Sequence, residues 1–280
     1  MTESAPAGRV NVSVSAGIAT VELDNPSQRN ALTRAMCLEL QNAMPRLESD
    51  PSVIAIALTG AGDAFCAGAA LSELNSVLLD EQPDGSRIDQ LSRADDAITA
   101  VGKPTVALVD GACIGGGWQI ASACDFILAS ERSTVAVTPA KLGIIYPRVG
   151  IERLVRLVGP ARAKFILFAG QVFSAADAEA LGLVVEAIPD DDFEDRCTAF
   201  LATVTSRSQF SVHTLKRLVD LAALGVPNVD GEWDAAWAAM TSGPDMAIGV
   251  NAFLNHQKAR FTWTPPQRAT PDNDGAPARD

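Results

Sequence analysis

The amino-acid sequence predicts an α/β fold from two observations. Residues 53–58 and 105–109 are continuous apolar runs, as expected for strands that are covered on both faces. Each run is followed by a glycine-containing loop, and the second loop leads into an alanine-rich run with helical character. A repeated order of strand, loop and helix is typical of α/β folds.

The N-terminal part predicts a strand pair and a helix. Residues 1–8 have the composition of a loose tail, and 10–15 and 18–23 alternate like two paired strands around a turn at Ala16-Gly17. Thr33 is placed to cap a helix that runs through Glu48, and Pro45 is expected to bend or shorten this helix.

The middle of the chain continues the alternation of strands and helices. The polar stretch 72–87 is expected to be a mobile loop near the first glycine segment. A helix over 88–101, the strand 105–109, a helix from Gly116 and a strand over 126–129 follow in order.

The last third of the chain is predicted to be helical. Pro160 opens a helix through Phe168, Ser174 caps a short helix that ends at Gly182, and three or four helices follow between Asp191 and Arg260. We therefore expect three parts, which are a core at 9–190, a helical subdomain at 191–262, and a disordered tail at 263–280.

Composition excludes several classes of function. The net charge of −12 argues against a nucleic-acid partner, because phosphate binding needs clustered Lys and Arg. No apolar window approaches the length of a membrane span, and the N-terminus lacks the pattern of a secretory signal. We therefore expect a cytoplasmic protein with no membrane partner.

Cysteine and histidine usage argues against a metal site. The five cysteines are scattered without paired metal spacing, and there are only two histidines. Reduced thiols and the absence of a bound metal are the expectation. Cys66 is not expected to act as a nucleophile, because no histidine lies near it in the sequence.

Two glycine-containing loops are the main candidates for a functional site. Gly115-Gly116-Gly117 lies between the strand 105–109 and a helix, and Ala64–Leu71 follows the strand 53–58. Glycine permits close approach of a backbone to an anion. Two such loops, roughly fifty residues apart, are able to present two backbone N–H groups to one oxygen, as in an oxyanion hole.

With these loops in register, the chain from about residue 10 to about 262 resembles the crotonase family, the enoyl-CoA hydratase/isomerase superfamily. The resemblance implies a spiral of ββα units with a C-terminal helical subdomain. It also implies an acyl-CoA thioester substrate, with coenzyme A as part of that substrate and no tightly bound cofactor. A homotrimer or a dimer of trimers is implied as well. The matching motifs are Asn25-Pro26, Arg29 to Leu32, Ala64 to Ala69, Lys103-Pro104, Gly115 to Gly117, Cys124-Asp125, Lys141 to Gly143, Ala178 to Val184 and Ala252 to Leu254.

The resemblance assigns roles to individual residues. The N–H groups of Ala69 and Gly116 are expected to hold the thioester oxygen of an enolate. Phe261 is expected to reach the CoA of a neighbouring subunit, with ordinary helix packing as the alternative. The residues expected to bind the CoA part of the substrate are Arg29, Ala31, Ala67, Ala69, Ala70, Leu71, Lys258 and Phe261.

Two positions depart from the hydratases of the family. Hydratases use two glutamates as acid and base, and this chain has Gln119 and Pro139 at those positions. Neither side chain exchanges a proton near neutral pH. Efficient hydration of an enoyl thioester by the usual route is therefore not expected.

One segment resembles a decarboxylase branch of the family that acts on methylmalonyl-CoA-type thioesters. This segment is Thr138-Pro139-Ala140-Lys141-Leu142-Gly143-Ile144-Ile145-Tyr146. Decarboxylation needs no general base, because departing CO₂ leaves its electron pair on the enolate. Tyr146 is expected to orient the substrate carboxylate or protonate the enolate, with a packing role as the alternative.

Two other functions stay open from the sequence. One is an enoyl-CoA hydratase or isomerase with a displaced acid or base, for example Glu73, Glu152 or a water held by Gln119. The other is a non-catalytic acyl-CoA-binding protein. Retained glycine loops favour an enzyme over the binding protein, since a pure binder does not need them.

Overall fold

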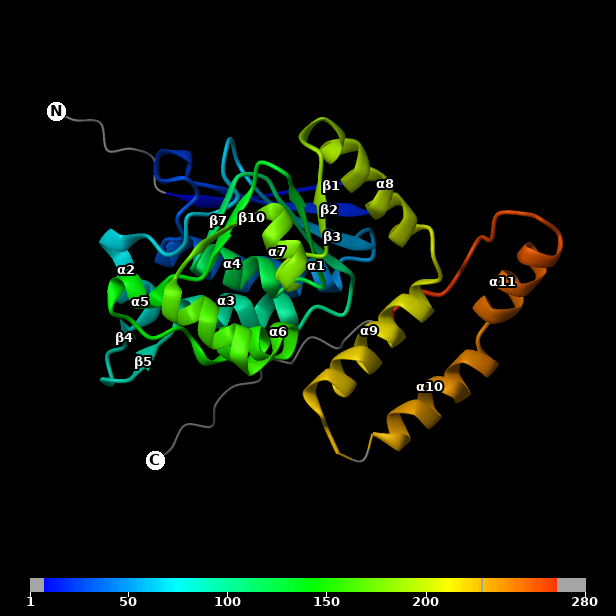
Figure 1. The fold of residues 1–280 in the computed structure, drawn as a ribbon. Helices are drawn as coiled ribbons and strands as arrows, with labels where there is room; N and C mark the ends of the chain where they lie inside the picture. Colours follow the sequence, from blue (N-terminus) through cyan, green and yellow to red (C-terminus); the bar gives the residue numbers. More distant parts are fainter. Residues whose placement is uncertain (1–7, 228, 266–280) are drawn as a thin grey trace, which may run out of the picture.

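A six-stranded sheet forms the centre of the molecule in the computed structural model, which describes residues 8–227 and 229–265 (Figure 1). Its order is β1-β2-β3-β6-β8-β11, and only the β1–β2 pair is antiparallel. The predicted α/β class is confirmed by this sheet and the helices on it. The strands are β1 Arg9–Ser15, β2 Ile18–Asp24, β3 Ala55–Gly60, β6 Thr105–Val109, β8 Phe126–Ser130 and β11 Glu186–Ile188.

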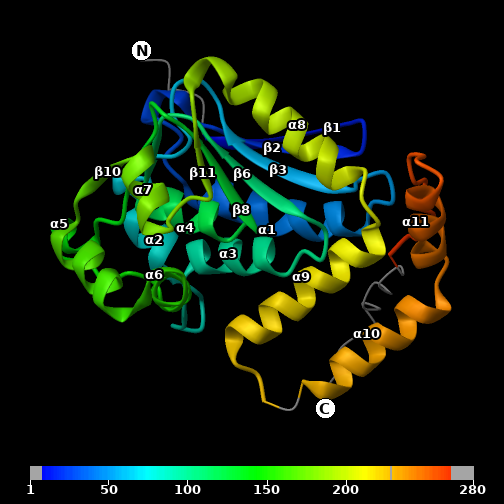
Figure 2. The same ribbon diagram turned by 45° about the vertical axis from the view of Figure 1, so that its right-hand side comes forward.

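Helices cover both faces of this sheet (Figure 2). Along β3, Ile56 and Leu58 face one cluster of buried apolar residues, which includes α1 (Arg34–Ser49), α3 (Gln90–Thr99) and α4 (Gly116–Ser122). Ala55 and Ala57 face the opposite cluster, where α8 (Phe193–Thr205) packs. The continuous apolar sequence of β3 follows from this burial on both sides.

Short strands that the sequence patterns did not predict build two smaller sheets. A three-stranded sheet joins β10, β9 and β7, and a two-stranded hairpin joins β4 and β5. With α2, this hairpin lies largely within the stretch 72–87, which therefore contains regular elements that the predicted mobile loop did not include. These elements are α2 Leu74–Leu78, β4 Asp80–Glu81, β5 Arg87–Ile88, β7 Ala112–Ile114, β9 Thr134–Ala136 and β10 Val172–Ser174.

Helix α1 links the two ends of the sheet. The Thr33 hydroxyl caps it by accepting a hydrogen bond from the Met36 amide nitrogen. The helix continues through Pro45 to Ser49, so the expected shortening is wrong. Met44 and Leu47 on either side of the proline are buried in the core, and this packing offsets the loss of one backbone hydrogen bond.

The region after β9 is more helical than predicted. Helix α5 (Pro139–Leu142) precedes α6 (Arg148–Ala169), which changes direction at Gly159 with φ 77°. The helix predicted from Pro160 is therefore the second half of α6. Helix α7 (Ala175–Leu181) has the predicted cap at Ser174 and ends at Gly182 with φ 82°.

The C-terminal helices α9 (Gln209–Leu224), α10 (Asp230–Ser242) and α11 (Asp245–Leu254) stand beside the rest of the chain, as Figures 1 and 2 show. Because α8 packs on the sheet, the helices that stand apart begin at Gln209, whereas the predicted subdomain begins at residue 191. Within the described residues, no helix is both long and apolar enough to cross a membrane.

Trp263 belongs to the folded part of the chain. Its ring centroid lies 5.4 Å from that of His213, and its backbone N–H donates to Asp245 Oδ1 at 3.3 Å. The predicted disordered tail therefore does not begin at residue 263. The rest of that tail from 266 onward, and the predicted loose tail 1–7, lie outside the described residues.

Candidate functional site

The two glycine-containing loops predicted to form the site lie side by side. The Cys66 N–H donates to the Ala112 carbonyl at 2.8 Å, and the Ile114 N–H donates to the Cys66 carbonyl at 2.9 Å. This pairing lays the first loop along β7. A Cβ on residue 117 would lie 2.4 Å from the Cys66 carbonyl oxygen, so only glycine permits this approach.

The pairing places the backbone N–H groups of Ala69 and Gly116 next to each other. A Cβ on residue 116 would lie 3.2 Å from the Ala69 nitrogen, and a Cβ on residue 68 would lie 3.5 Å from the Gly116 nitrogen. Neither N–H donates a hydrogen bond to any residue in 8–227 or 229–265. Two free donors in this arrangement are able to bind one oxygen that carries negative charge.

A cavity of about 170 Å³ adjoins these N–H groups; we call it the N–H cavity. Its only polar side chains from the described residues are those of Thr138 and Tyr146. No carboxylate, imidazole or ammonium group from this part of the chain lines it. Its other walls are backbone of the two loops, Pro139, Pro147 and the apolar side chains of Leu71, Leu74, Leu78, Leu91, Ile114, Leu142, Ile144 and Ile145.

The predicted CoA-binding residues with small or aliphatic side chains separate into two groups. Ala67, Ala69 and Leu71 line the N–H cavity. Ala70 is 1% exposed, and Ala31 is buried with its carbonyl accepting from the side-chain amide of Asn25. Both residues therefore support the loop and do not line the N–H cavity, and their contact with a ligand stays a prediction.

Arg29 is exposed and lines a separate hollow of about 470 Å³, together with Pro26 and Ala64. Its backbone carbonyl accepts a hydrogen bond from the Ala67 N–H at 2.9 Å. Arg29 therefore fixes the first loop through its backbone, and its guanidinium does not line the N–H cavity.

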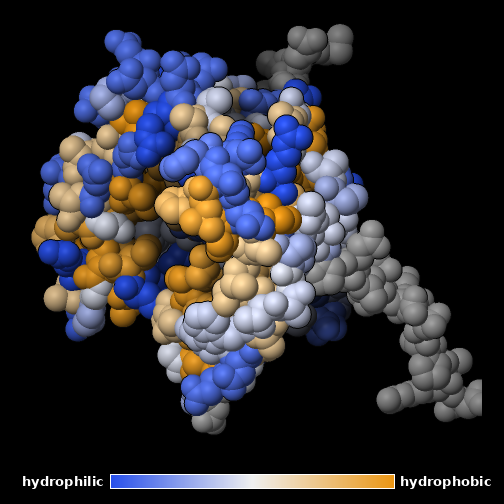
Figure 3. Space-filling view, turned by 90° about the vertical axis from the view of Figure 1, so that its right-hand side faces the viewer, coloured by the Kyte–Doolittle hydropathy of each residue, from blue (hydrophilic) through white to orange (hydrophobic). Residues whose placement is uncertain are grey.

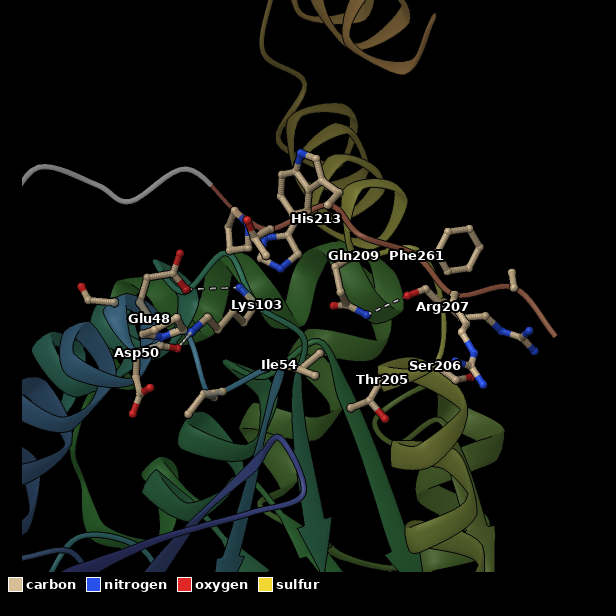
Figure 4. Close-up of a pocket in the computed structure, with 18 of the residues that line it drawn as sticks. Glu48, Asp50, Ile54, Lys103, Thr205, Ser206, Arg207, Gln209, His213 and Phe261 are labelled. Atoms are coloured by element: carbon tan, nitrogen blue, oxygen red, sulfur yellow. Dashed lines mark hydrogen bonds between the residues drawn. The ribbon is translucent and has the colours of Figure 1, made fainter. Parts of the chain in front are cut away.

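Lys258 and Phe261 lie at the other end of the sheet. They line a cavity of about 930 Å³, which we call the C-terminal cavity, between the chain after α11 and the residues that precede β3 (Figure 4). Glu48, Lys103 and His213 line it as well. Within one chain, Lys258 and Phe261 do not line the N–H cavity. Their contact with CoA, for Phe261 the CoA of a neighbouring subunit, stays a prediction.

Gln119 lies behind the N–H cavity and does not line it. The side chain is 0% exposed, and neither its amide oxygen nor its amide nitrogen has a hydrogen-bond partner among the described residues. Pro139, the second position predicted to replace a catalytic glutamate, is buried at the start of α5 and lines the cavity.

The two displaced acids considered from the sequence point elsewhere. The Glu73 carboxylate accepts from the Arg34 backbone N–H at the start of α1, at 3.1 Å. Glu152 accepts from Arg148 Nε at 2.6 Å on the exposed side of α6. Neither carboxylate lines the N–H cavity.

Tyr146 lines the cavity, but its hydroxyl is engaged by the backbone. The side chain is 6% exposed, and the hydroxyl donates to the Gly115 carbonyl at 2.9 Å. Burial raises the pKa of the phenol well above its usual value. The single phenolic hydrogen is therefore not directed at a substrate, in contrast to the predicted role. The sequence could not predict this hydrogen bond, because it does not show which backbone carbonyl lies near the hydroxyl.

Cys66 has the environment of a structural thiol. It is 0% exposed, and burial raises the pKa of its thiol to about 12. A thiol of this kind stays protonated and unreactive near neutral pH. Within the described residues, no cluster of three or more His, Cys, Asp or Glu side chains is arranged to hold a metal ion.

Residues 13–263 match the family model described as enoyl-CoA hydratase/isomerase. The chain belongs to this family. A solved structure described as an enoyl-CoA hydratase/isomerase family member is 60% identical, has a TM-score of 0.91, and is matched over 93% of this chain and 99% of its own. The α/β fold described above is thus the crotonase fold.

Curated members of the enoyl-CoA hydratase/isomerase family are more distant. A Thermus thermophilus protein that carries an enoyl-CoA hydratase name is 35% identical over 249 residues, which are 87% of this chain and 97% of the relative. The crotonyl-CoA hydratase of Syntrophomonas wolfei is 30% identical over 250 residues, 87% of this chain and 94% of the relative.

Much of the wall of the N–H cavity comes from residues that the sequence did not predict. Leu74 and Leu78 come from α2, and Leu91 comes from α3. Their apolar side chains carry no chemical signal that separates a cavity wall from a core, so only the folded structure could identify them.

Proposed function

We propose that this protein decarboxylates a malonyl-type acyl-CoA thioester through an enolate held by the Ala69 and Gly116 N–H groups. The observation that carries the proposal is the composition of the N–H cavity. Two free backbone donors adjoin it, and no described side chain that lines it is an acid or base able to exchange a proton near pH 7. Decarboxylation is a reaction of this family that needs the two backbone donors but does not need an acid or base to form the enolate.

In the proposed step, the bond between the α-carbon and the carboxylate breaks. Its electron pair enters the thioester as an enolate while CO₂ leaves, and the α-carbon then takes a proton from water. The negative charge on the thioester oxygen develops between the two N–H groups, which form an oxyanion hole. Each such donor typically contributes about 10²–10³ to the rate.

The surroundings of the N–H pair suit this step. The Thr138 hydroxyl lines the cavity and makes no hydrogen bond to another described residue, so it is available to hold the substrate carboxylate. The mostly apolar walls keep that carboxylate poorly solvated, which favours loss of CO₂. Gln119 supports the second loop from behind, and a role in contacting substrate requires it to turn toward the cavity.

We further propose that the chain assembles as a homotrimer or dimer of trimers, in which Lys258 and Phe261 contact CoA bound to a neighbouring copy. Support comes from apolar side chains on the C-terminal helices, with Phe253 81% exposed and Trp237 59% exposed. Figure 3 views this side and shows hydrophobic surface over these helices. Exposed apolar surface of this kind is typical of interfaces. A cytoplasmic location stays a prediction.

Hydration of an enoyl thioester is the second candidate, because curated relatives at 30–35% identity carry hydratase names. In this chain it requires an acid and a base from outside the described lining of the N–H cavity. A non-catalytic acyl-CoA-binding protein is the third candidate, and the free N–H pair argues against it.

The test is a side-by-side assay of the purified protein on methylmalonyl-CoA, for CO₂ release, and on crotonyl-CoA, for hydration. We expect CO₂ release and negligible hydration. Robust hydration overturns the proposal in favour of the second candidate. Binding of both thioesters without turnover of either favours the third.

A further inference from the structure

The peptide unit between Gly115 and Gly116 carries both a hydrogen bond to Tyr146 and one of the two free N–H groups. Strand β7 ends at Ile114 and α4 begins at Gly116, with Gly115 between them at φ 55° and ψ −112°. In a planar trans peptide, the carbonyl of one residue and the N–H of the next point in opposite directions. Whatever fixes the Gly115 carbonyl therefore also fixes the direction of the Gly116 N–H.

Two donors hold the Gly115 carbonyl. The Gln119 backbone N–H donates to it at 3.1 Å within the first turn of α4, and the Tyr146 hydroxyl donates at 2.9 Å from the segment between α5 and α6. Hydrogen bonds in a chain polarise one another, with a strengthening of roughly 10–30% per bond. A donor on the carbonyl thus makes the N–H of the same peptide a stronger donor.

The packing around the phenol holds it in place. A Cβ on residue 150 would lie 2.5 Å from the ring of Tyr146, so glycine at the start of α6 makes room for the ring. The ring is buried, and burial keeps the phenol protonated, as its raised pKa indicates. The hydroxyl is therefore a permanent donor at neutral pH.

We propose that Tyr146 is a positioning residue that acts through the Gly115 carbonyl, orienting and strengthening the Gly116 N–H that holds the thioester oxygen. This inference rests on the proposed function, because it assumes that the N–H pair binds that oxygen. It assigns no proton transfer to Tyr146 and no contact between its hydroxyl and the substrate carboxylate.

Removal of the hydroxyl should leave the fold intact, because other contacts hold α4. Arg153 on α6 donates to Ser122 on α4 at 3.4 Å and forms a bidentate pair with Asp95 on α3 at 2.6 Å. The Gln119 bond to Gly115 is also independent of Tyr146. A Tyr146→Phe variant therefore loses one donor on one carbonyl.

The first measurement is the absorbance spectrum of bound cinnamoyl-CoA, a conjugated thioester whose band moves to longer wavelength when its carbonyl is polarised. We expect a clear shift on the wild-type protein and a smaller shift on Tyr146→Phe, with the dissociation constant changed by less than about threefold. In turnover, kcat should fall roughly tenfold with little change in KM, since only part of one donor's contribution is lost. The control is Thr99→Val, which removes a hydroxyl that bonds to Arg153 Nη2 at 3.1 Å and should keep the wild-type spectrum.

The composition of the chain allows a second measurement that does not depend on a substitution. Tyr146 is the only tyrosine, so growth on 3-fluorotyrosine changes this phenol alone and makes it a stronger donor. We expect the shift of bound cinnamoyl-CoA to equal or exceed that of the wild type, opposite in direction to the Phe variant.

The outcomes separate this inference from the proposed function. A full wavelength shift and unchanged kcat in Tyr146→Phe overturn the inference alone. Loss of cinnamoyl-CoA binding in a folded Tyr146→Phe protein also overturns it, since Tyr146 then contacts the ligand directly. A bound ligand with no shift on the wild type overturns the oxyanion hole of the proposed function, and this inference with it. If the Phe variant does not fold, a fluorotyrosine protein with a reduced shift overturns the inference.

Discussion

The two ends of the central sheet carry two cavities of opposite construction. The N–H cavity, beyond the carboxyl end of β3, has a volume of about 170 Å³ and is built from backbone and apolar side chains. The C-terminal cavity, before the amino end of β3, has a volume of about 930 Å³ and is lined by several charged side chains, among them Glu48, Asp50 and Lys103. Free backbone donors, and not volume, therefore mark the candidate site.

Two charged groups of the C-terminal cavity, Lys103 and Glu48, are hydrogen-bonded within the protein. Lys103 is 2% exposed, and its ammonium donates to the carbonyls of Leu47 and Asp50 at the end of α1, at 2.7 and 2.6 Å. Glu48 accepts from the Gly102 N–H at 3.0 Å. These bonds stabilise the fold, whereas the Ala69 and Gly116 N–H groups stay free for a ligand.

The largest expected effect comes from removing the Gly116 N–H group, which adjoins the N–H cavity. Gly116→Pro replaces the N–H by a ring carbon and should lower kcat/KM for CO₂ release by about 10²–10³, while CoA binding persists. Proline is tolerated in the first turn of a helix. Steady-state kinetics measure kcat/KM for CO₂ release, and a binding assay measures the affinity for CoA.

Gly116→Ala is the matched control for the proline variant. It keeps the N–H and adds a methyl group 3.2 Å from the Ala69 nitrogen. An equal loss in both variants would show that crowding, and not the N–H, causes the effect.

The second prediction concerns the other end of the sheet. Lys103→Met leaves the Leu47 and Asp50 carbonyls without their donor, so the free energy of unfolding should fall by about 1–3 kcal/mol. The kcat should stay close to the wild-type value. Urea unfolding and the CO₂ assay measure the two properties, and a large loss of kcat in a folded variant would contradict the separation of the two ends.

The third prediction tests whether Lys258, at the C-terminal cavity of one copy, contacts CoA that is bound to a neighbouring copy. In a trimer, Lys258→Ala should raise KM for the CoA thioester by roughly twofold to fivefold, as for one exposed charge contact, with kcat unchanged. Lys164→Ala, an exposed lysine on α6, is the charge-matched control. Light scattering gives the oligomeric state, and an equal effect of both variants would count against contact with a neighbouring CoA.

The smallest effect concerns α1, which spans the distance between the ends. Burial raises the pKa of Cys37 on α1 to about 12. In the unfolded chain the Cys37 thiol loses its proton near its ordinary pKa of 9.0, whereas in the folded chain it stays protonated at that pH. This contribution to stability is therefore complete below pH 9 and decreases as the pH rises toward 12.

The alkaline loss of stability is measured by urea unfolding at pH 8, 9 and 10. Cys37→Ala should show a shallower decrease than the wild type over this range, by at most about 1.4 kcal/mol per pH unit. Equal slopes in both proteins would mean that Cys37 does not contribute.

Local patterns in the sequence were sufficient for much of the fold. The strand at Thr105–Val109, the cap at Ser174 and the strand pair around Ala16-Gly17 match the structure, because propensity, capping and turn chemistry act over a few residues. Glycine spacing likewise pointed to the two loops, since close backbone approach needs glycine wherever it occurs. Enoyl-CoA hydratase/isomerase membership followed from the same motifs.

Contacts across the chain decided the rest. The three-residue strands β7, β9 and β10 exist because they pair with each other, and α8 belongs to the core because its apolar face covers the sheet. The hydroxyl of Tyr146 donates to the Gly115 carbonyl, thirty-one positions away in the sequence. Lys258 and Phe261 line the C-terminal cavity. A sequence states which groups a chain carries, but hydrogen bonds and burial depend on distances that only the folded chain sets.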